Sequence, residues 1–207
     1  AEVWLAGEGR QQELLQQEFP DLPFLPLAGY KVKYAPSGIG LILNILFQIR
    51  RIIYAIKKEN EWLKKMILEY RFDGVISDNR YGLHNPSITC VFITHQLNIK
   101  SPLGKWTERM LQRRIYQYIN QFTECWVPDT KPDNNLAGVL SHPENKPAVP
   151  VYYVGHLSRF QLLNEPVKDN HLLILLSGPE PQRSILENKI IRDIAHYPST
   201  ATIIRGL

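Results

Sequence analysis

GVISDNRYGLHNPSITCVFITHQ, residues 74–96, is the stretch of sequence that decides the fold. It contains two apolar runs, Gly74–Ser77 and Thr89–Thr94, each about the length of one β-strand and free of proline. Neither run alternates polar with apolar residues, as a strand with one face in water would. Near-continuous apolar strands are typical of a parallel sheet covered on both faces. We therefore predict two neighbouring parallel strands, each followed directly by polar residues.

The same alternation of strands and helices extends over the rest of the chain. Apolar residues recur at spacings near 3.6 in four segments, which we predict to be helices. The longest of these is one helix, or two joined around Glu59-Asn60. The predicted helices are 10–19, 39–70, 104–122 and 181–196, and the further strands are 3–5, 23–27, 30–34, 124–127, 151–154, 172–176 and 201–204. This order predicts an α/β architecture with parallel sheets.

The pattern relaxes once, between Leu157 and Asn170, into sequence that contains proline and charged residues. Such composition is typical of a domain boundary. We predict one α/β domain at 1–155 and the beginning of a second at 156–207. Because the chain starts and ends close to predicted strands, we expect it to be a piece of a longer protein.

The composition is that of a soluble globular protein, with 44% hydrophobic and 21% charged residues. It excludes a disordered chain, collagen and a disulfide scaffold. The most apolar stretch, Leu41–Ile56, is interrupted by Arg50 and Arg51, so no transmembrane helix is expected. Cys90 and Cys125 lie in apolar surroundings, which suits a reducing compartment. We predict a cytoplasmic protein.

The net charge of +4 conceals an uneven distribution. Residues 31–114 carry +9, whereas the remaining residues together carry −5. A basic region of this kind indicates an anionic partner for part of the surface, such as a membrane face, a phosphorylated ligand or a nucleic acid.

Three pairs of cations recur at seven-residue intervals within this basic region. Seven residues are nearly two helical turns, so all six form one stripe if the predicted 39–70 helix is continuous. Acidic residues four positions away are sparse, which weakens the alternative of an ordinary solvated helix face. Anionic lipid headgroups would suit this stripe, whereas no nucleic-acid motif accompanies it. The predicted membrane-surface residues are Arg50, Arg51, Lys57, Lys58, Lys64 and Lys65.

Polar residues follow the predicted strands at the sheet edge where ligands of open parallel sheets bind. Asp78 and His95 are the candidate catalytic bases, because either could take a proton from an acceptor hydroxyl if burial moved its pKa toward neutrality. The alternative is an internal Asp78–Arg80 pair with a structural His95. The other predicted residues of this acceptor-side cleft are Gly7, Glu8, Gly9, Asn79, Arg80 and Gln96, each of which could equally cap a helix.

A second candidate site follows the apolar strand 172–176. The strand ends in Ser-Gly, prolines stiffen the loop, and a helix begins near Gln182. Backbone N–H groups at the start of such a helix point outward and can bind an anionic ligand. Arg183 adds a forked cation suited to phosphate. The alternative is a proline-rich turn with an arginine on the helix surface. The predicted diphosphate-binding residues are Ser177, Gly178, Pro179, Glu180, Gln182 and Arg183.

No Cys or His grouping has the spacing of a metal site, so no metal is expected. We interpret Cys90 and Cys125 as core residues. His142 and His171 are interpreted as loop residues with no partner visible in the sequence.

The segments 77–82, 93–97 and 177–183, in this order, resemble bacterial predicted glycosyltransferases, which are similar to the enzyme that adds N-acetylglucosamine to the lipid-linked peptidoglycan precursor (glycosyltransferase family 28-like). The resemblance runs through nearly the whole chain. It implies the GT-B fold, in which two Rossmann-like domains face each other across a cleft. The first domain would bind the acceptor and the second the nucleotide-sugar donor, with 153–159 crossing between them and 178–183 meeting the donor diphosphate.

The resemblance also implies which parts of the family's architecture lie outside these 207 residues. They are the first strand and glycine-rich loop of the acceptor domain and the half of the donor domain that holds the base and ribose. We therefore expect no turnover from this chain alone.

Together these observations predict a metal-independent hexosyltransferase without a cofactor. It would move a sugar from a nucleotide-diphosphate sugar to the hydroxyl of an acceptor. The resemblance implies that the donor is UDP-linked and that the acceptor can be lipid-linked. We expect it in the cytoplasm, peripherally at the inner face of the membrane. Two alternatives stay open: a non-catalytic membrane-docking subunit of a glycosyltransferase, and a UDP-sugar epimerase of the same fold.

Overall fold

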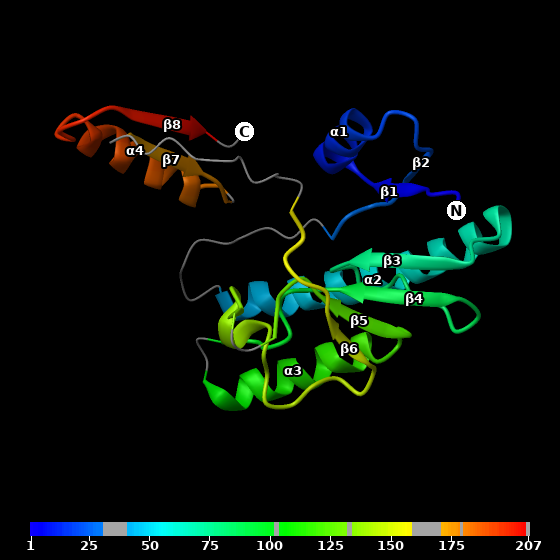
Figure 1. The fold of residues 1–207 in the computed structure, drawn as a ribbon. Helices are drawn as coiled ribbons and strands as arrows, with labels where there is room; N and C mark the ends of the chain where they lie inside the picture. Colours follow the sequence, from blue (N-terminus) through cyan, green and yellow to red (C-terminus); the bar gives the residue numbers. More distant parts are fainter. Residues whose placement is uncertain (31–40, 102–103, 132–133, 159–170, 179, 206–207) are drawn as a thin grey trace. The chain divides into compact units, whose positions relative to one another are not determined.

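The protein forms two compact units, Ala1–Leu157 and Ser158–Leu207, which we call unit 1 and unit 2. The computed structural model describes residues 1–30, 41–101, 104–131, 134–158, 171–178 and 180–205, with the backbone alone for 41–49 (Figure 1). The division falls two residues after the predicted boundary at 155. Part of the predicted strand 30–34 lies outside the described residues, as does Pro179.

Unit 1 alternates strands and helices as the sequence predicts, except that β4 follows β3 without a helix between them, which corrects the expectation of strand–helix–strand order throughout. Its elements are β1 (Leu5–Gly7), α1 (Gly9–Glu18), β2 (Phe24–Pro26), α2 (Leu41–Tyr70), β3 (Gly74–Asp78), β4 (Thr89–Ile93), α3 (Lys105–Ile119), β5 (Glu124–Val127), the short 3₁₀ helix η2 (Gly138–Leu140) and β6 (Val151–Tyr153). The first strand lies two residues later than predicted, so Gly7 pairs with Pro26 inside the sheet rather than lying in a turn.

Strands β3, β4, β5 and β6 form one parallel sheet in chain order, and β1 and β2 form a separate parallel pair. The predicted parallel α/β architecture is therefore confirmed. Asp78 is in register with Ile93, and Ile93 is in register with Trp126. The carboxyl ends of neighbouring strands consequently meet at one edge of the sheet (Figure 1). Asn79, Arg80 and Gln96 follow at this edge, whereas Gly7, Glu8 and Gly9 lie at the end of β1 in the separate pair.

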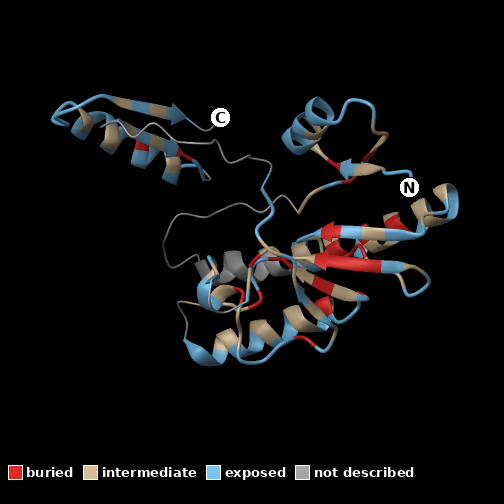
Figure 2. Ribbon diagram, viewed as in Figure 1, coloured by how far each residue is buried: buried red, intermediate tan, exposed pale blue. Residues whose placement is uncertain are grey.

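The core of unit 1 lies between the four-stranded sheet and the helices that pack on it. Phe92 and Cys125 of the sheet pack with Ile119 of α3 in one cluster. Leu63 of α2 packs with Leu83 in a second, and Val75 of β3 packs against both clusters. Buried residues accordingly gather along the middle strands of this sheet (Figure 2).

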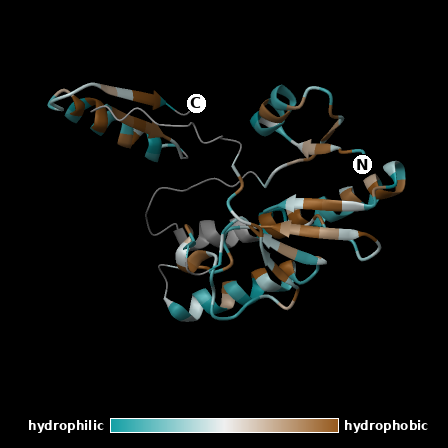
Figure 3. Cartoon of the chain, viewed as in Figure 1, coloured by the Kyte–Doolittle hydropathy of each residue, from teal (hydrophilic) through white to brown (hydrophobic). Residues whose placement is uncertain are grey.

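Only one face of this sheet is covered by helices in the described residues, which differs from the prediction of two covered faces. Val75, Phe92 and Cys125 share the covered face, because strand side chains alternate between faces. On the opposite face Ile76 is 62% exposed and Tyr152 is 51% exposed. β4 is nevertheless hydrophobic along most of its length, and β3 is hydrophobic in its middle, before it ends in Ser77 and Asp78 (Figure 3). The apolar sequence therefore predicted the strands correctly but not what covers them.

Helix α2 is a single continuous helix, which settles the choice between one helix and two. Ile56, Glu59 and Leu63 are buried along it, at the three- and four-residue spacing that places side chains on one face. Most of the other side chains of α2 between residues 50 and 70 are exposed or half-buried. Among the residues described here, none of the helices combines the length and the hydropathy needed to cross a bilayer.

Unit 2 is one strand–helix–strand unit, made of β7 (Leu172–Leu176), α4 (Gln182–Ile194) and β8 (Ala201–Arg205). Its two strands are parallel, as predicted. Leu176 at the end of β7 is buried. Glu187 of α4 is also buried and pairs with Nε of Arg205, its Oε1 atom lying 2.5 Å away, which ties the helix to β8.

Candidate functional site

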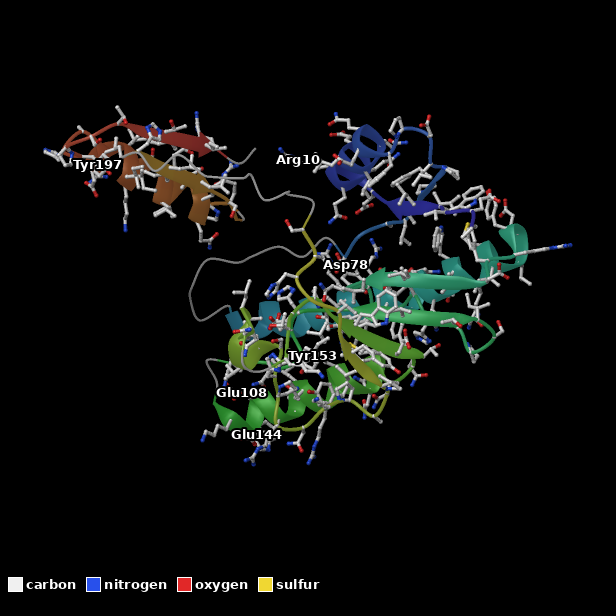
Figure 4. All side chains as sticks on the ribbon, in the orientation of Figure 1. Arg10, Asp78, Glu108, Glu144, Tyr153 and Tyr197 are labelled. Atoms are coloured by element: carbon white, nitrogen blue, oxygen red, sulfur yellow. The ribbon has the colours of Figure 1, made fainter. Side chains whose placement is uncertain are left out.

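The residues that follow β3 lie at the carboxyl edge of the four-stranded sheet. Asp78 is exposed at the arrowhead end of β3 (Figure 4). Asn79 adopts a positive φ of 53° and donates a hydrogen bond from Nδ2 to Oδ1 of Asp78 at 3.1 Å. Its backbone N–H donates to the Ile93 carbonyl at 3.0 Å. This turn therefore holds the Asp78 carboxylate beside the end of β4.

His95 and Gln96 follow β4 at the same edge. Both are exposed, whereas Thr94 before them is buried and its hydroxyl accepts the Gln96 N–H at 3.1 Å. The strand register brings Asp78, Asn79, His95 and Gln96 to adjacent strand ends, as the sequence predicts. The sequence analysis made burial of Asp78 or His95 a condition for either residue to act as a catalytic base. In unit 1 both side chains are exposed.

A cavity of about 780 Å³ lies between β1 and β3. Apolar side chains line most of it, among them Leu5 of β1, Val75 of β3 and Trp62 of α2. Asp78 contributes a carboxylate to the same lining. A cavity of this size is in the range of small-molecule sites, so the candidate base borders a space that an acceptor could enter.

Arg80 is not available as a free cation at this edge of the sheet. Its Nε and a terminal nitrogen each lie 2.7 Å from Oε1 of Glu59, and it also donates to the Ala28 carbonyl. The predicted alternative of an Asp78–Arg80 pair is not found either. The guanidinium instead joins three separate segments: α2, the turn after β3 and the segment after β2.

Glu59 is the centre of a buried polar network that the sequence analysis did not identify. Only 3% of its surface is exposed. Besides Arg80, its carboxylate accepts the Tyr30 hydroxyl at 2.7 Å and the Gly82 N–H at 3.0 Å. Burial and the Glu59 carboxylate raise the pKa of Tyr30 above its usual range. The sequence signal was a lone acidic residue on the apolar face of α2, between Ile56 and Leu63.

Gly82 allows the turn after β3 to approach α2 this closely. A Cβ atom at this position would lie 2.3 Å from the Ile56 carbonyl oxygen and 2.5 Å from the Glu59 Cβ. Such distances are far inside van der Waals contact. The glycine is therefore required by packing, and the Ser77–Gly82 segment is held to the helix by its backbone.

A second buried carboxylate, Asp129, follows β5 and is 1% exposed. It accepts the Ser141 hydroxyl at 2.5 Å and the N–H groups of Thr130 and Leu136 at 2.9 Å each and of Ala137 at 3.3 Å. Burial by itself raises the pKa of Asp129, but these hydrogen bonds outweigh it and hold that pKa well below its usual range. The carboxylate thus joins Thr130, Leu136, Ala137 and Ser141 in the described part of the loop between β5 and β6.

Two histidines face Asp129. Nε2 of His156 lies 3.3 Å from Oδ1, and Nε2 of His142 lies 3.5 Å from Oδ2. The His142 ring stacks on Tyr153 with centroids 4.6 Å apart. The ring nitrogens of His171 lie 2.8 Å from the hydroxyls of Thr200 and Thr202. Both histidines lie outside the helices and strands, as predicted, and the structure gives each of them partners that the sequence does not show.

The remaining acceptor-side candidates lie around the end of β1. Gly7 is buried in the strand, and Gly9 begins α1 with a φ of 58°. Glu8 lies against Gly29, where an added Cβ would come within 2.7 Å of its Oε1 atom. Gly7 and Glu8 thus lie close to the segment after β2, but Gly7 is the last residue of the strand rather than part of the predicted turn.

The two cysteines lie in the core, in agreement with their interpretation. Cys90 and Cys125 are both free and buried. Burial raises the pKa of Cys90 and raises that of Cys125 to about 12. Neither thiol is therefore ionised near neutral pH. Among the described residues, no group of three or more His, Cys, Asp or Glu side chains could hold a metal ion.

The predicted diphosphate loop lies in unit 2 between β7 and α4. Gly178 has a φ of 114°, a backbone conformation that favours glycine. Glu180 accepts hydrogen bonds from Nε of Arg183 at 2.9 Å and from the Ser184 N–H at 3.3 Å. The hydrogen bonds from Ser184 and Arg183 lower the pKa of Glu180. Ser177 and Gln182 are exposed at the two ends of this loop.

All six cations predicted for the membrane surface are exposed on α2. Four of them line one side of a second cavity in unit 1, of about 750 Å³, whose other side is formed by Leu27–Tyr30. These four are Arg50, Arg51, Lys58 and Lys65. Lys57 and Lys64 do not belong to this lining. The basic stripe is thus divided into four cations that line the cavity and two, Lys57 and Lys64, that do not.

Comparison of the chain with protein-family models, with curated proteins and with solved structures gave no match. The interpretation of the two loops and the basic pocket therefore depends on their geometry and chemistry.

Proposed function

We propose that this protein belongs to a glycosyltransferase of the GT-B type, with unit 1 on the acceptor side and unit 2 on the donor side. It would transfer a hexose from a nucleotide-diphosphate sugar to an acceptor hydroxyl. The parallel strands of both units, with polar residues or glycine after their carboxyl ends, support this proposal. Location in the cytoplasm and contact with an anionic membrane face are part of it.

The observation that carries the proposal is the loop between β7 and α4. The apolar strand, the positive φ of Gly178 and the helix that begins at Gln182 form a strand–loop–helix unit of the kind that holds phosphate groups. In the structure the Glu180 carboxylate lies against Arg183 and the Ser184 N–H. This position already stabilises a negative charge, and a donor diphosphate would replace that carboxylate.

In the proposed reaction an acceptor oxygen bonds to the anomeric carbon of the sugar. The bond from that carbon to the diphosphate oxygen breaks, and the electron pair leaves with the nucleoside diphosphate. Arg183 and the start of α4 stabilise the developing negative charge. Asp78 or His95 would take the proton of the acceptor hydroxyl once the bound acceptor covers these strand ends, which are exposed in the structure.

Binding of UDP, measured by isothermal titration calorimetry, tests the donor site. Arg183→Ala should weaken binding about tenfold, which corresponds to roughly 1.4 kcal/mol. Glu180→Gln should strengthen binding, because it removes the carboxylate that competes for Arg183. Arg192→Ala, at the other end of the same helix, is the matched control and should leave the affinity unchanged.

Two results would contradict the proposal. One is the absence of binding to any nucleoside diphosphate. The other is an equal effect of Arg183→Ala and Arg192→Ala, which would indicate unspecific attraction to a basic surface. Product analysis with UDP-N-acetylglucosamine, on a full-length protein that includes the rest of the proposed donor domain, separates transfer from epimerisation. Transfer or hydrolysis releases UDP, whereas an epimerase keeps the nucleotide on the sugar.

A further inference from the structure

The basic pocket of unit 1 lies between α2 and Leu27–Tyr30, and it has no role in the donor site proposed above. The cavity measures about 750 Å³, within the range of small-molecule sites. Its position in the fold is fixed by contacts on both sides. Leu27 packs with Leu63 in a buried cluster, and Tyr30 donates its hydroxyl hydrogen to Glu59 at 2.7 Å.

The cations reach this pocket because of helical spacing. Arg51, Lys58 and Lys65 are separated by seven residues each, and Ala55 and Trp62 lie between them at steps of three and four. Residues with these steps lie along one side of a helix. Lys57 and Lys64 precede Lys58 and Lys65 by one residue and do not line the pocket, whereas Arg50, at the same seven-residue position, does. Helical spacing therefore accounts for Arg51, Lys58 and Lys65, and Arg50 adds a fourth cation to the lining.

The pocket carries an excess of positive charge. Its two carboxylates, Glu59 and Glu61, are both engaged, the first by Arg80 and the second by Lys58 at 2.9 Å. No ion pair joins Arg50, Arg51 or Lys65 to any other residue that the structure describes. Three cations therefore face a concave space without an ion pair, and only Lys65 among them is near enough to the Glu61 carboxylate to lower its pKa. The ligand chemistry that suits them is anionic.

The walls of the pocket are apolar and aromatic. Leu27, Ala55 and Trp62 contribute to them, and Tyr54 is 63% exposed although it is a large aromatic residue. Lys58 Nζ lies 5.7 Å from the centre of the Tyr54 ring. A purely ionic partner would leave these surfaces in water. A ligand that combines an anionic group with an apolar one would use both kinds of wall.

We propose that this pocket binds a phosphate ester that carries an apolar group. The guanidinium groups of Arg50 and Arg51 suit two oxygens of a phosphate, because each presents paired N–H donors in a plane. The apolar group lies against Tyr54 and Trp62. Two sources share this chemistry, a soluble phosphate ester and the headgroup region of an anionic phospholipid.

The test uses the 207-residue chain and dihexanoyl phosphatidic acid below its micelle concentration, measured by calorimetry. Arg51→Glu should weaken binding at least about tenfold, and Lys65→Glu should do the same. Lys57→Glu is the matched control, since it reverses the same charge on the same helix outside the pocket. Its affinity should stay within about twofold of the parent chain. Tyr54→Ala should also weaken binding, whereas inorganic phosphate should bind more weakly than the ester.

Two outcomes would overturn the proposal: no binding of the ester, or equal losses for Arg51→Glu and Lys57→Glu. Arg51, Lys57 and Lys65 are exposed, so their substitution should leave the melting temperature unchanged. A thermal melt of each variant checks that it is folded. Flotation with phosphatidylcholine vesicles containing phosphatidic acid separates the two sources. Binding to vesicles that Arg51→Glu abolishes assigns the pocket to lipid, and ester binding without flotation assigns it to a soluble ligand. The pocket is in unit 1 and the donor loop in unit 2, so each proposal can fail separately.

Discussion

At the scale of single residues, the Glu59 carboxylate decides how α2 and the turn after β3 are joined. It receives hydrogen bonds from Arg80, Tyr30 and the Gly82 N–H while almost fully buried. A buried charge is tolerated only when its partners satisfy it, and removing one partner leaves the others unpaired. The conspicuous Asp78-Asn79-Arg80 sequence therefore contains one residue of the scaffold and two that remain at the exposed edge.

Glu59→Gln should destabilise unit 1 by about 3 kcal/mol, because Arg80 loses its charged partner in a largely buried position. The free energy of unfolding in urea measures this. Glu61→Gln is the control: it makes the same change two residues away, in an exposed pair with Lys58, and should shift the urea midpoint little. Equal shifts for the two variants would show that the Glu59 network does not stabilise the fold.

At the scale of elements, the long loop between β5 and β6 is organised by one side chain. Asp129 binds backbone N–H groups on either side of the residues 132–133 and the hydroxyl of Ser141. Its own carbonyl accepts the Gly155 N–H at 3.1 Å, after β6. The end of unit 1 is thus fixed to the carboxyl end of β5.

The stability contributed by Asp129 should depend on pH. Its folded-state pKa is lower than the unfolded value of about 3.9, so the contribution is fully present above about pH 4. It is lost as the pH falls through the folded-state pKa. Asp129→Asn should therefore lower the melting temperature at pH 7, and the difference from the parent chain should shrink as the solution is acidified. The exposed Asp73→Asn is the control, and a difference that persists unchanged in acid would contradict this account.

At the scale of the whole molecule, the two units differ in how much they bury. In unit 1, β4 lies between β3 and β5, and Cys90, Val91 and Phe92 are all buried. In unit 2, β7 pairs only with β8 among the described strands, and Leu173 and Leu175 remain exposed. Burial of apolar surface is the main source of stability, so the two units should not be equally stable.

Amide hydrogen exchange should reveal this difference. The amides of β7 should exchange well before those of β4, because fewer buried contacts oppose local opening. Mass spectrometry of peptides from 172–176 and 89–93 measures both rates in one sample. Exchange of β7 at the rate of β4 would mean that the chain unfolds as one cooperative unit, contrary to its division at Leu157.

The helices and strands could be predicted from the sequence because they depend on local periodicity. The strand at 172–176 and the strand at 124–127 were predicted with the boundaries observed. The face of the sheet that helices cover could not be predicted. A strand that is apolar on both sides has the same sequence pattern whether helices cover one side or both. Asp78 and His95 were placed correctly at strand ends, but their exposure depends on neighbours distant in the chain.

The sequence by itself determined the parallel α/β architecture, the single boundary near 155 and the basic character of α2, because each of these follows from residues close together in the chain. Only the tertiary structure decided which polar residues are buried and which are available. Arg80 is committed to Glu59, 21 residues away, and four of six cations on α2 line a pocket with Leu27–Tyr30. Burial and charge pairing depend on contacts between distant segments, which periodicity along one segment does not record.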